Sequence, residues 1–176
     1  LYARRPSRRL RPLRGREIGA IFQDPLTSLN PLYTIERQLV ETMMTHLGIS
    51  KRKARERAIE LLHEVGIPSA EERIHHYPHQ FSGGMRQRVV IALALCSDPK
   101  LIIADEPTTA LDVSIQAQII GLMKKLCRDY QTAILLITHD MGVIAETADR
   151  VAVMYAGRVV EIGSVRDVVR RGQHPY

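Results

Sequence analysis

Hydrophobic residues recur with different spacings along the chain, and each spacing predicts a different kind of element. A short apolar run at residues 18–22 predicts a strand, which ends before Pro25 because proline does not continue it easily. Apolar residues then fall on single helical stripes over residues 34–48, 51–65 and 82–97. The middle of the chain is therefore predicted to be mostly helical.

Two continuous apolar runs follow, at residues 101–104 and 133–137, and they predict strands buried on both faces of a parallel sheet. The residues between them carry one apolar helical stripe, so strand, helix and strand form a right-handed βαβ unit. The remaining pattern predicts a short helix at residues 143–148, a hairpin with strands at residues 151–155 and 158–162, and a final helix from Val165 onward. The fold class is therefore α/β with a helical insertion.

Length and composition agree with a folded domain. The chain has 176 residues, of which 45% are hydrophobic, enough for one domain or a domain with a subdomain. Its apolar runs are well short of the roughly 20 residues that cross a bilayer, and no secretory signal pattern is present, so we expect a soluble, cytosolic chain. Cys96 and Cys127 lie far apart in the sequence, which favours buried thiols over a metal knuckle or a redox pair.

Positive charge is concentrated at the start of the chain. The formal net charge is +6, and a series of arginines precedes the first acidic residue, Glu17. Residues 1–16 have no apolar period and are predicted to be irregular. Such a segment is either a solvated basic end or a binding site for an anionic partner, such as a membrane surface or nucleic acid.

Polar residues with catalytic potential follow the two buried strands. Asp105 and Glu106 come directly after the first strand, where ligands bind in open α/β sheets. One carboxylate there can hold Mg²⁺, and the other can orient or deprotonate a water that attacks a γ-phosphate. His139 follows the second strand, so that it can converge on the same site and donate a hydrogen bond to that phosphate.

A second candidate site lies at the start of the third predicted helix. Ser82-Gly83-Gly84 opens that helix, where unpaired backbone N–H groups and the positive end of the dipole favour an anion. The glycines allow a phosphate to approach the backbone closely, and the serine hydroxyl adds a donor. The motif therefore predicts a phosphate-binding position.

The order of these motifs resembles the nucleotide-binding subunit of ABC transporters, from about Gly15 to Tyr176. The matching segments are Gln23, Phe81-Ser82-Gly83-Gly84-Met85, Leu101-Ile102-Ile103-Ala104-Asp105-Glu106-Pro107, Ala110-Leu111-Asp112 and His139. The resemblance implies a partial P-loop NTPase fold, RecA-like, with a parallel-sheet core and an α-helical subdomain. Residues 1–24 would belong to the core, residues 25–97 to the helical subdomain that ends in the signature helix, and residues 98–176 to the catalytic core.

The resemblance also implies roles and ligands for the site residues. With ATP and Mg²⁺ as the implied ligands, Gln23 would contact the metal and the attacking water and couple to a membrane subunit. Asp105 would be the Walker B aspartate that holds the metal, and Glu106 would be the catalytic base. His139 would be the switch histidine.

The resemblance also implies that other residues contact a second ATP, bound by the partner subunit. Two ATPase subunits would sandwich ATP head to tail, so that Ser82, Gly83 and Gly84 of one chain complete the site of its partner. Asp112 falls in the D-loop, which is also expected to bind the cofactor.

Within the family, several segments resemble dipeptide and oligopeptide importers. These segments are Phe22-Gln23-Asp24-Pro25, Ser28-Leu29-Asn30-Pro31, Tyr77-Pro78-His79-Gln80-Phe81 and Gln173-His174-Pro175-Tyr176. The resemblance implies an ATPase that powers peptide uptake from the cytoplasmic face of the inner membrane. Its partners would be permease subunits, a second ATPase in a heterodimer and, indirectly, a solute-binding protein. A metal site at His75, His76 and His79 is the weaker interpretation, because the spacing around proline is poor for ligands.

The sequence departs from the family pattern at two places. Met85 stands where many ABC signatures have glutamine. The phosphate loop, Gly-x-x-x-x-Gly-Lys-Ser/Thr, does not occur in the sequence, nor does the aromatic residue that usually stacks on adenine. We therefore expect a truncated subunit that binds ATP poorly and is inactive alone.

Two alternatives stay open at this point. The chain could be a non-catalytic partner that lends only its Ser82-Gly83-Gly84 surface to another subunit. It could also be a soluble ABC ATPase that acts on nucleic acid, which the arginine-rich start permits but the transporter-like residues 22–31 disfavour.

Overall fold

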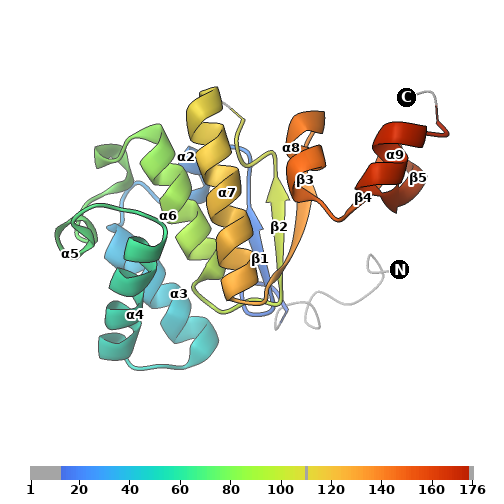
Figure 1. Cartoon of the computed structure of the whole chain (residues 1–176). Coiled ribbons are helices and arrows are strands. Elements are labelled where there is room, and N and C mark those ends of the chain that lie inside the picture. Colours follow the sequence, from blue (N-terminus) through green and yellow to red (C-terminus); the bar gives the residue numbers. More distant parts are fainter. Residues whose placement is uncertain (1–12, 110, 175–176) are drawn as a thin grey trace. The chain divides into compact units, whose positions relative to one another are not determined.

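The computed structural model describes residues 13–109 and 111–174. These residues form two compact units, one ending at Ile137 and one beginning at Thr138, which we call the first and second units (Figure 1). The sequence did not predict this boundary, and the division into 1–24, 25–97 and 98–176 stays a prediction. Among the described residues, no helix has the length and apolar content needed to cross a membrane.

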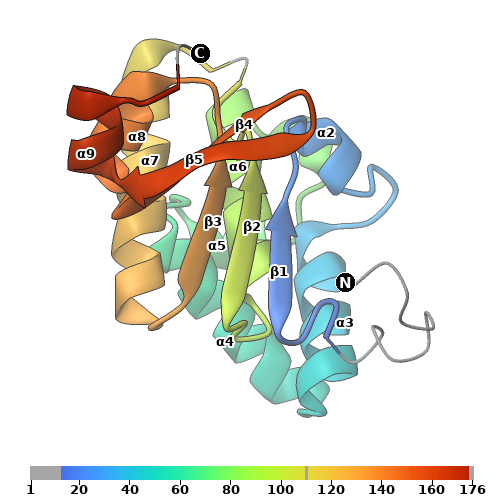
Figure 2. The same ribbon diagram turned by 90° about the vertical axis from the view of Figure 1, so that its right-hand side faces the viewer.

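A parallel three-stranded sheet lies at the centre of the first unit. Its strands are β1 (Ile18–Ile21), β2 (Leu101–Asp105) and β3 (Ala133–Ile137), in the order β1-β2-β3 (Figure 2). Ala104 of β2 lies between Ile21 and Leu136 in the register, so the three strands end at the same edge. The three strands lie where the sequence predicts them.

The helices of the first unit begin and end where local signals predict. Thr34 caps the start of α3 by accepting a hydrogen bond from the Arg37 N–H at 3.3 Å, and Gly48 ends that helix with a φ of 66°. The helices are α2 (Pro25–Ser28), α3 (Ile35–Leu47), α4 (Lys51–Glu64), α5 (Ala70–Arg73), the 3₁₀ helix η2 (Pro78–Gln80), α6 (Gly83–Leu95) and α7 (Val113–Asp129).

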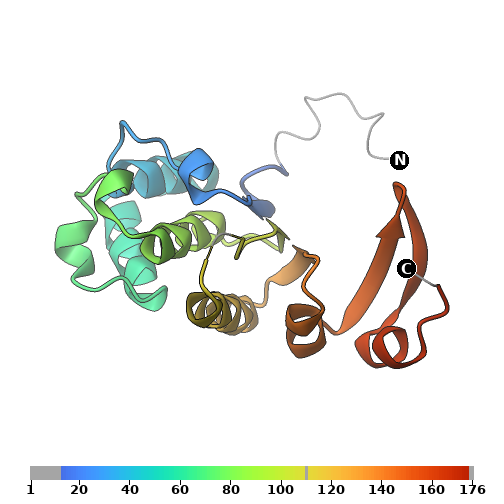
Figure 3. The same ribbon diagram turned by 90° about the horizontal axis from the view of Figure 1, so that it is seen from above.

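Helix α6 is the centre of the hydrophobic core. It is apolar on nearly all sides and carries seven buried residues, because α3 and α4 pack on it from one direction and β1 and α7 from another. Seen from above in Figure 3, α6 and α7 lie on the same side of the strands. Ile102 and Ala104 of β2 are buried together with Ile119 and Met123 of α7 in this core.

The prediction that β2 and β3 are buried on both faces was wrong. Ile102 and Ala104 are buried, but Ile134, Leu135 and Ile137 of β3 are exposed. The reason is that α6 and α7 cover one face of the sheet and that β3 is an edge strand of the three. Among the described residues, helices therefore cover only one face of β2 and β3.

The second unit contains α8 (Met141–Thr147), β4 (Arg150–Tyr155), β5 (Arg158–Ser164) and α9 (Val165–Arg171). β4 and β5 form an antiparallel hairpin, whose turn at Ala156 and Gly157 has φ values of 47° and 76°. Ser164 caps α9 by accepting from the Asp167 N–H at 3.2 Å, as the sequence predicts. The predicted elements of this unit are confirmed to within two residues at their starts.

A polar cluster connects α4 to the end of α7. Arg57 of α4 donates to the Tyr130 hydroxyl at 3.0 Å, and that hydroxyl donates to Glu64. Arg57 also lies 3.5 Å from Asp98, in the loop after α6. Burial, followed by the hydrogen bond to Glu64, raises the pKa of Tyr130 from 10.0 to about 12. The cluster therefore holds a neutral phenol between the helical segment and the sheet-bearing part of the first unit.

Replacing Tyr130 with Phe is expected to lower the free energy of unfolding by about 1 kcal/mol near neutral pH, because the hydroxyl's partners lose their hydrogen bonds. The pKa is higher in the folded state, so the phenol's contribution is fully present below pH 10.0 and is lost as the pH rises through about 12. Urea denaturation of both proteins across this range measures the effect. A difference between them that does not change with pH would contradict the assignment.

Candidate functional site

Glu106 lies at the carboxyl end of β2 in an unusual backbone conformation. Its φ is 44°, in the left-handed region that residues other than glycine rarely adopt, and its N–H donates to the carbonyl of Ile137 at 2.9 Å. Such strain persists where the surroundings hold it, and it concentrates at functional sites. The connection to β3 therefore fixes the position of the Glu106 carboxylate.

Two side chains converge on one oxygen of that carboxylate. Gln23 donates from Nε2 to Glu106 Oε2 at 3.0 Å, although the two residues are 83 positions apart. Thr109 donates from Oγ1 to the same oxygen at 2.9 Å. The fold thus brings together Gln23 and Glu106, which the sequence predicts to share a site, and it holds the carboxylate in one orientation.

Asp105 and Gln23 supply the oxygen atoms that could bind a metal ion. Asp105 is the exposed last residue of β2, and Gln23 directs its amide nitrogen to Glu106, so its amide oxygen remains as a ligand. Carboxylate and amide oxygens suit Mg²⁺, which usually takes one or two protein ligands together with substrate phosphates and water. Within the described ranges, no three His, Cys, Asp or Glu side chains are grouped to hold a metal. Asp105 and Gln23 supply two oxygen ligands, the number that Mg²⁺ commonly takes from a protein when phosphate and water complete its shell.

The start of α6 has an exposed glycine. Ser82 caps the helix by accepting from the Met85 N–H at 3.4 Å. A Cβ added at Gly83 would meet no atom of the described residues within 4 Å, whereas one at Gly84 would lie 3.2 Å from Ile115 of α7. Packing in the first unit thus explains a small residue at Gly84 but not at Gly83.

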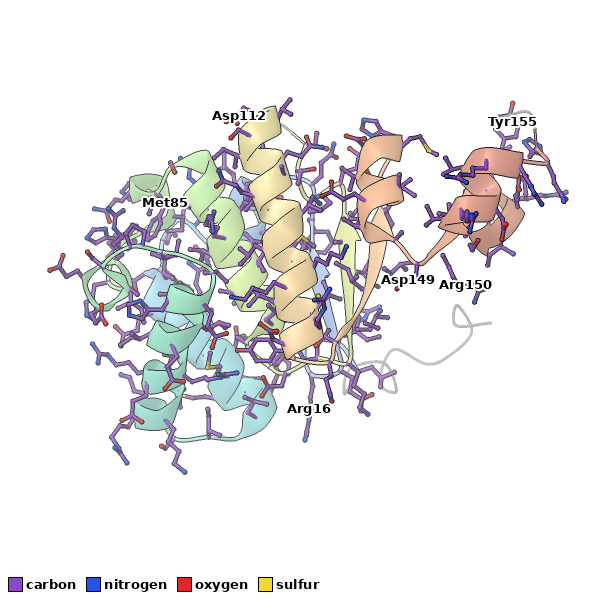
Figure 4. The ribbon with its side chains drawn as sticks, viewed as in Figure 1. Arg16, Met85, Asp112, Asp149, Arg150 and Tyr155 are labelled. Carbon is purple, nitrogen blue, oxygen red and sulfur yellow. The ribbon has the colours of Figure 1, made fainter. Side chains whose placement is uncertain are left out.

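Asp112 caps α7, with Oδ1 accepting from the Ile115 N–H at 2.9 Å. Figure 4 labels Asp112 and Met85 near the starts of α7 and α6, which lie at one end of the first unit. The three parallel strands also end there, as their arrowheads in Figure 1 show. Ala110, which belongs to the same predicted motif, lies outside the described residues.

His139 belongs to the second unit. It is exposed, and it precedes Asp140, which caps α8 by accepting from the N–H groups of Gly142 and Val143 at 2.8 and 3.2 Å. Only Thr138 separates His139 from the end of β3 in the sequence. Its convergence with Glu106 stays a prediction.

The two cysteines are buried, as the sequence predicts. Burial raises the pKa of the Cys96 thiol to about 12, and it also raises the pKa of Cys127. Thiols in this state are poor nucleophiles and poor metal ligands. The cysteines therefore belong to the core and not to the site.

Sequence reasoning missed the role of Thr109. The residue stands in the run Pro107-Thr108-Thr109 that drew attention to the acidic pair, but no spacing rule indicated which hydroxyl would face Glu106. Its N–H donates to the Glu106 carbonyl at 3.1 Å, which closes a turn and carries the hydroxyl back to the carboxylate. The position of the Thr109 hydroxyl three residues after Glu106 is the sequence feature that could have indicated this contact.

Comparison with known proteins places this geometry in a family. Residues 3–109 match the family model described as ABC transporter, which is more than half of the chain. Among curated proteins, the oligopeptide transport ATP-binding protein OppD of Bacillus subtilis is 60% identical over 93% of this chain and 46% of its own length. The dipeptide transport ATP-binding protein DppD of the same organism is 55% identical over 95% of this chain and 49% of its own length. The chain thus spans about half the length of these relatives.

Solved structures agree with the sequence relatives. The dimeric ATP-binding cassette MJ0796, in a post-hydrolysis state bound to ADP and Pi, superposes with a TM-score of 0.78 at 31% identity over 93% of this chain and 69% of that chain. CbiO1 of Clostridium perfringens, part of an ABC transporter complex, has a TM-score of 0.78 at 29% identity over 93% of this chain and 62% of its own. These matches confirm the predicted α/β fold of P-loop NTPase type. The chain belongs to the ABC transporter family.

Proposed function

We propose that this chain belongs to the ATP-binding and ATP-hydrolysing subunit of an ABC importer that powers the uptake of dipeptides or oligopeptides. The observation that carries the proposal is the carboxylate of Glu106, held by Gln23 and Thr109 at the carboxyl end of β2. A general base must be fixed in one orientation to act on a bound water, and these two donors supply that orientation. The names of the relatives support peptides as the transported solute.

In the proposed reaction, Glu106 takes a proton from the water that attacks the γ-phosphate of ATP. Gln23 lies against Glu106 and can hold the same water, so the nucleophile is oriented by two side chains. When bound, Mg²⁺ would be held by Asp105 and Gln23, and it would neutralise charge on the phosphates. The exposed position of Asp105 at the strand end is consistent with that role.

A second ATP is proposed to bind at the start of α6, supplied by a partner ATPase in a head-to-tail heterodimer. The exposed Gly83 N–H and the Ser82 hydroxyl would contact its phosphate, and Gly83 has no neighbour among the described residues that requires glycine. Asp112, at the nearby start of α7, would contribute to the same contact between subunits. His139 would donate a hydrogen bond to the γ-phosphate at this chain's own site.

The membrane partner is proposed to be a permease that binds next to the Gln23 loop, residues 22–24. Phe22 belongs to that loop, Leu26 and Leu32 follow it in the sequence, and all three side chains are exposed, Leu32 to 79%. Contiguous exposed apolar side chains can mark a protein interface, and these three are the candidates next to the loop. The chain would then lie on the cytoplasmic face of the inner membrane, and a solute-binding protein would act on it indirectly through the permease.

The complete transporter, with its permease and both ATPase subunits, tests the proposal by ATP hydrolysis. The rate should rise when the peptide-loaded binding protein is added and should not respond to DNA. Stimulation by DNA, with no response to peptide, would instead support an ABC ATPase that acts on nucleic acid. The matched control is the binding protein without peptide.

A further inference from the structure

One buried polar atom in α6 has no partner. The Gln87 side chain is 1% exposed, and its amide nitrogen Nε2 is the one buried side-chain nitrogen or oxygen, among the described residues, that makes no hydrogen bond. Buried polar groups are almost always paired, because an unmade hydrogen bond leaves the cost of desolvation uncompensated. The unpaired amide therefore calls for an explanation.

The neighbours of Gln87 in α6 are firmly held. Arg86 donates from Nε to the Phe81 carbonyl at 2.9 Å, and Arg88 donates to the Val65 carbonyl at 2.7 Å. Both contacts fix the rotation of the helix on either side of Gln87. A simple turn of α6 would break these two bonds, so the partner of Gln87 has to come from another segment.

The packing of α6 on β1 indicates which segment that is. The end of α6 lies at the start of β1, because Ser97 donates to the Gly15 carbonyl and a Cβ at Gly19 would collide with the Ala94 carbonyl oxygen. Gln87 lies seven residues earlier in the helix than Ala94, about 10 Å along its axis. That distance corresponds to about three residues of a strand and places Gln87 level with Phe22, where the Gln23 loop leaves the sheet.

We infer that Gln87 is a positioning residue for the Gln23 loop, residues 22–24. In a second position of this loop, the Gln87 amide donates to the main-chain carbonyl of Phe22 or Gln23. The Asp24 carbonyl is already used by Thr27 and Ser28 in α2. The inference rests on the proposed function, in which the Gln23 loop shifts to bring the amide oxygen of Gln23 onto the metal while its amide nitrogen stays on Glu106.

A methionine at position 87 distinguishes the present position of the Gln23 loop, in which the Gln87 amide has no partner, from the second position, in which the amide donates. Methionine has nearly the shape of glutamine and no hydrogen-bond donor. In the complete transporter, Gln87→Met should raise the Tm by about 2–4 °C, since it removes an unpaired amide from the core. The same variant should lower kcat for ATP hydrolysis about tenfold and leave KM for ATP within about twofold, because the Gln87 amide donates only in the second position of the loop, after ATP has bound.

Thr132→Val is the matched control. Thr132 is also buried, but its hydroxyl donates to the Pro99 carbonyl at 2.8 Å, so its removal should lower the Tm and leave kcat within about twofold. A fall in Tm for Gln87→Met would show that the amide is already paired, and an unchanged kcat would show that the donor is not used. Either result overturns the inference while the proposed function stands. If the unmodified transporter hydrolyses no ATP, the proposed function fails and the inference fails with it.

Discussion

Replacing Glu106 with Gln is expected to lower ATP turnover by the complete transporter about 1,000-fold, the range found when a general base is removed. Glutamine keeps the shape of the side chain and an oxygen that can accept from Gln23 and Thr109. It cannot take up a proton from the attacking water. ATP should therefore bind with nearly unchanged affinity and remain uncleaved, which steady-state hydrolysis and nucleotide-binding measurements report separately.

Glu72→Gln is the control for this prediction, because Glu72 is an exposed acid on α5 outside the site. That variant should turn over ATP at the unmodified rate. If Glu106→Gln does the same, the chain is a non-catalytic partner that lends only the start of α6. A loss of ATP binding together with turnover would show that the substitution damages the fold and not the chemical step.

Replacing Gly19 with Ala is expected to destabilise the fold by about 3 kcal/mol, the upper part of the usual range for overpacking a core. A Cβ at this position would collide with the main-chain oxygen of Ala94 in α6. A side chain could rotate away, but a main-chain carbonyl inside a buried helix cannot move without shifting the helix. Gly19 therefore sets how closely α6 packs on β1, and urea denaturation measures the loss.

Replacing Gly121 with Ala should instead raise the free energy of unfolding. Gly121 lies within α7, and a Cβ there would meet no described atom within 4 Å, so Ala should raise the free energy of unfolding by about 0.5–1 kcal/mol through helix propensity. Equal stabilities of Gly19→Ala and Gly121→Ala would contradict close packing between α6 and β1.

The sequence was sufficient for elements whose limits depend on local chemistry. Thr34 and Ser82 accept hydrogen bonds from N–H groups in the first turns of α3 and α6, and Gly48 adopts the left-handed conformation that ends α3. These signals act within three or four residues, so spacing and residue type alone predict them. The short helices α2 and α5 were not predicted, since four residues carry no detectable period.

Features set by long-range packing could not be predicted in this way. The exposure of Leu135 depends on which helices cover the sheet, and the sequence of β3 alone does not contain that information. The strained φ of Glu106 arises because its N–H bonds to Ile137 on the neighbouring strand. Both properties follow from contacts between residues far apart in the sequence.

The candidate site was predicted in outline. The rule that ligands bind beyond the carboxyl ends of parallel strands indicated Asp105 and Glu106, and the resemblance to ABC subunits added Gln23. The contact between Gln23 and Glu106 spans 83 residues, so it depends on β1 and β2 being neighbours in the sheet. Thr109 and the unpaired Gln87 amide emerge from side-chain geometry, which no spacing of residue types encodes.

Peptide uptake into sealed vesicles that contain the complete transporter tests whether ATP hydrolysis at Glu106 powers import. Labelled oligopeptide is supplied with its binding protein on one side of the membrane, and ATP on the side that carries the ATPase subunits. We predict ATP-dependent accumulation with the unmodified transporter and none with the transporter that carries Glu106→Gln, although that variant still binds ATP. Equal accumulation with Glu106→Gln, or accumulation that does not require ATP, would contradict peptide import driven by ATP hydrolysis at Glu106.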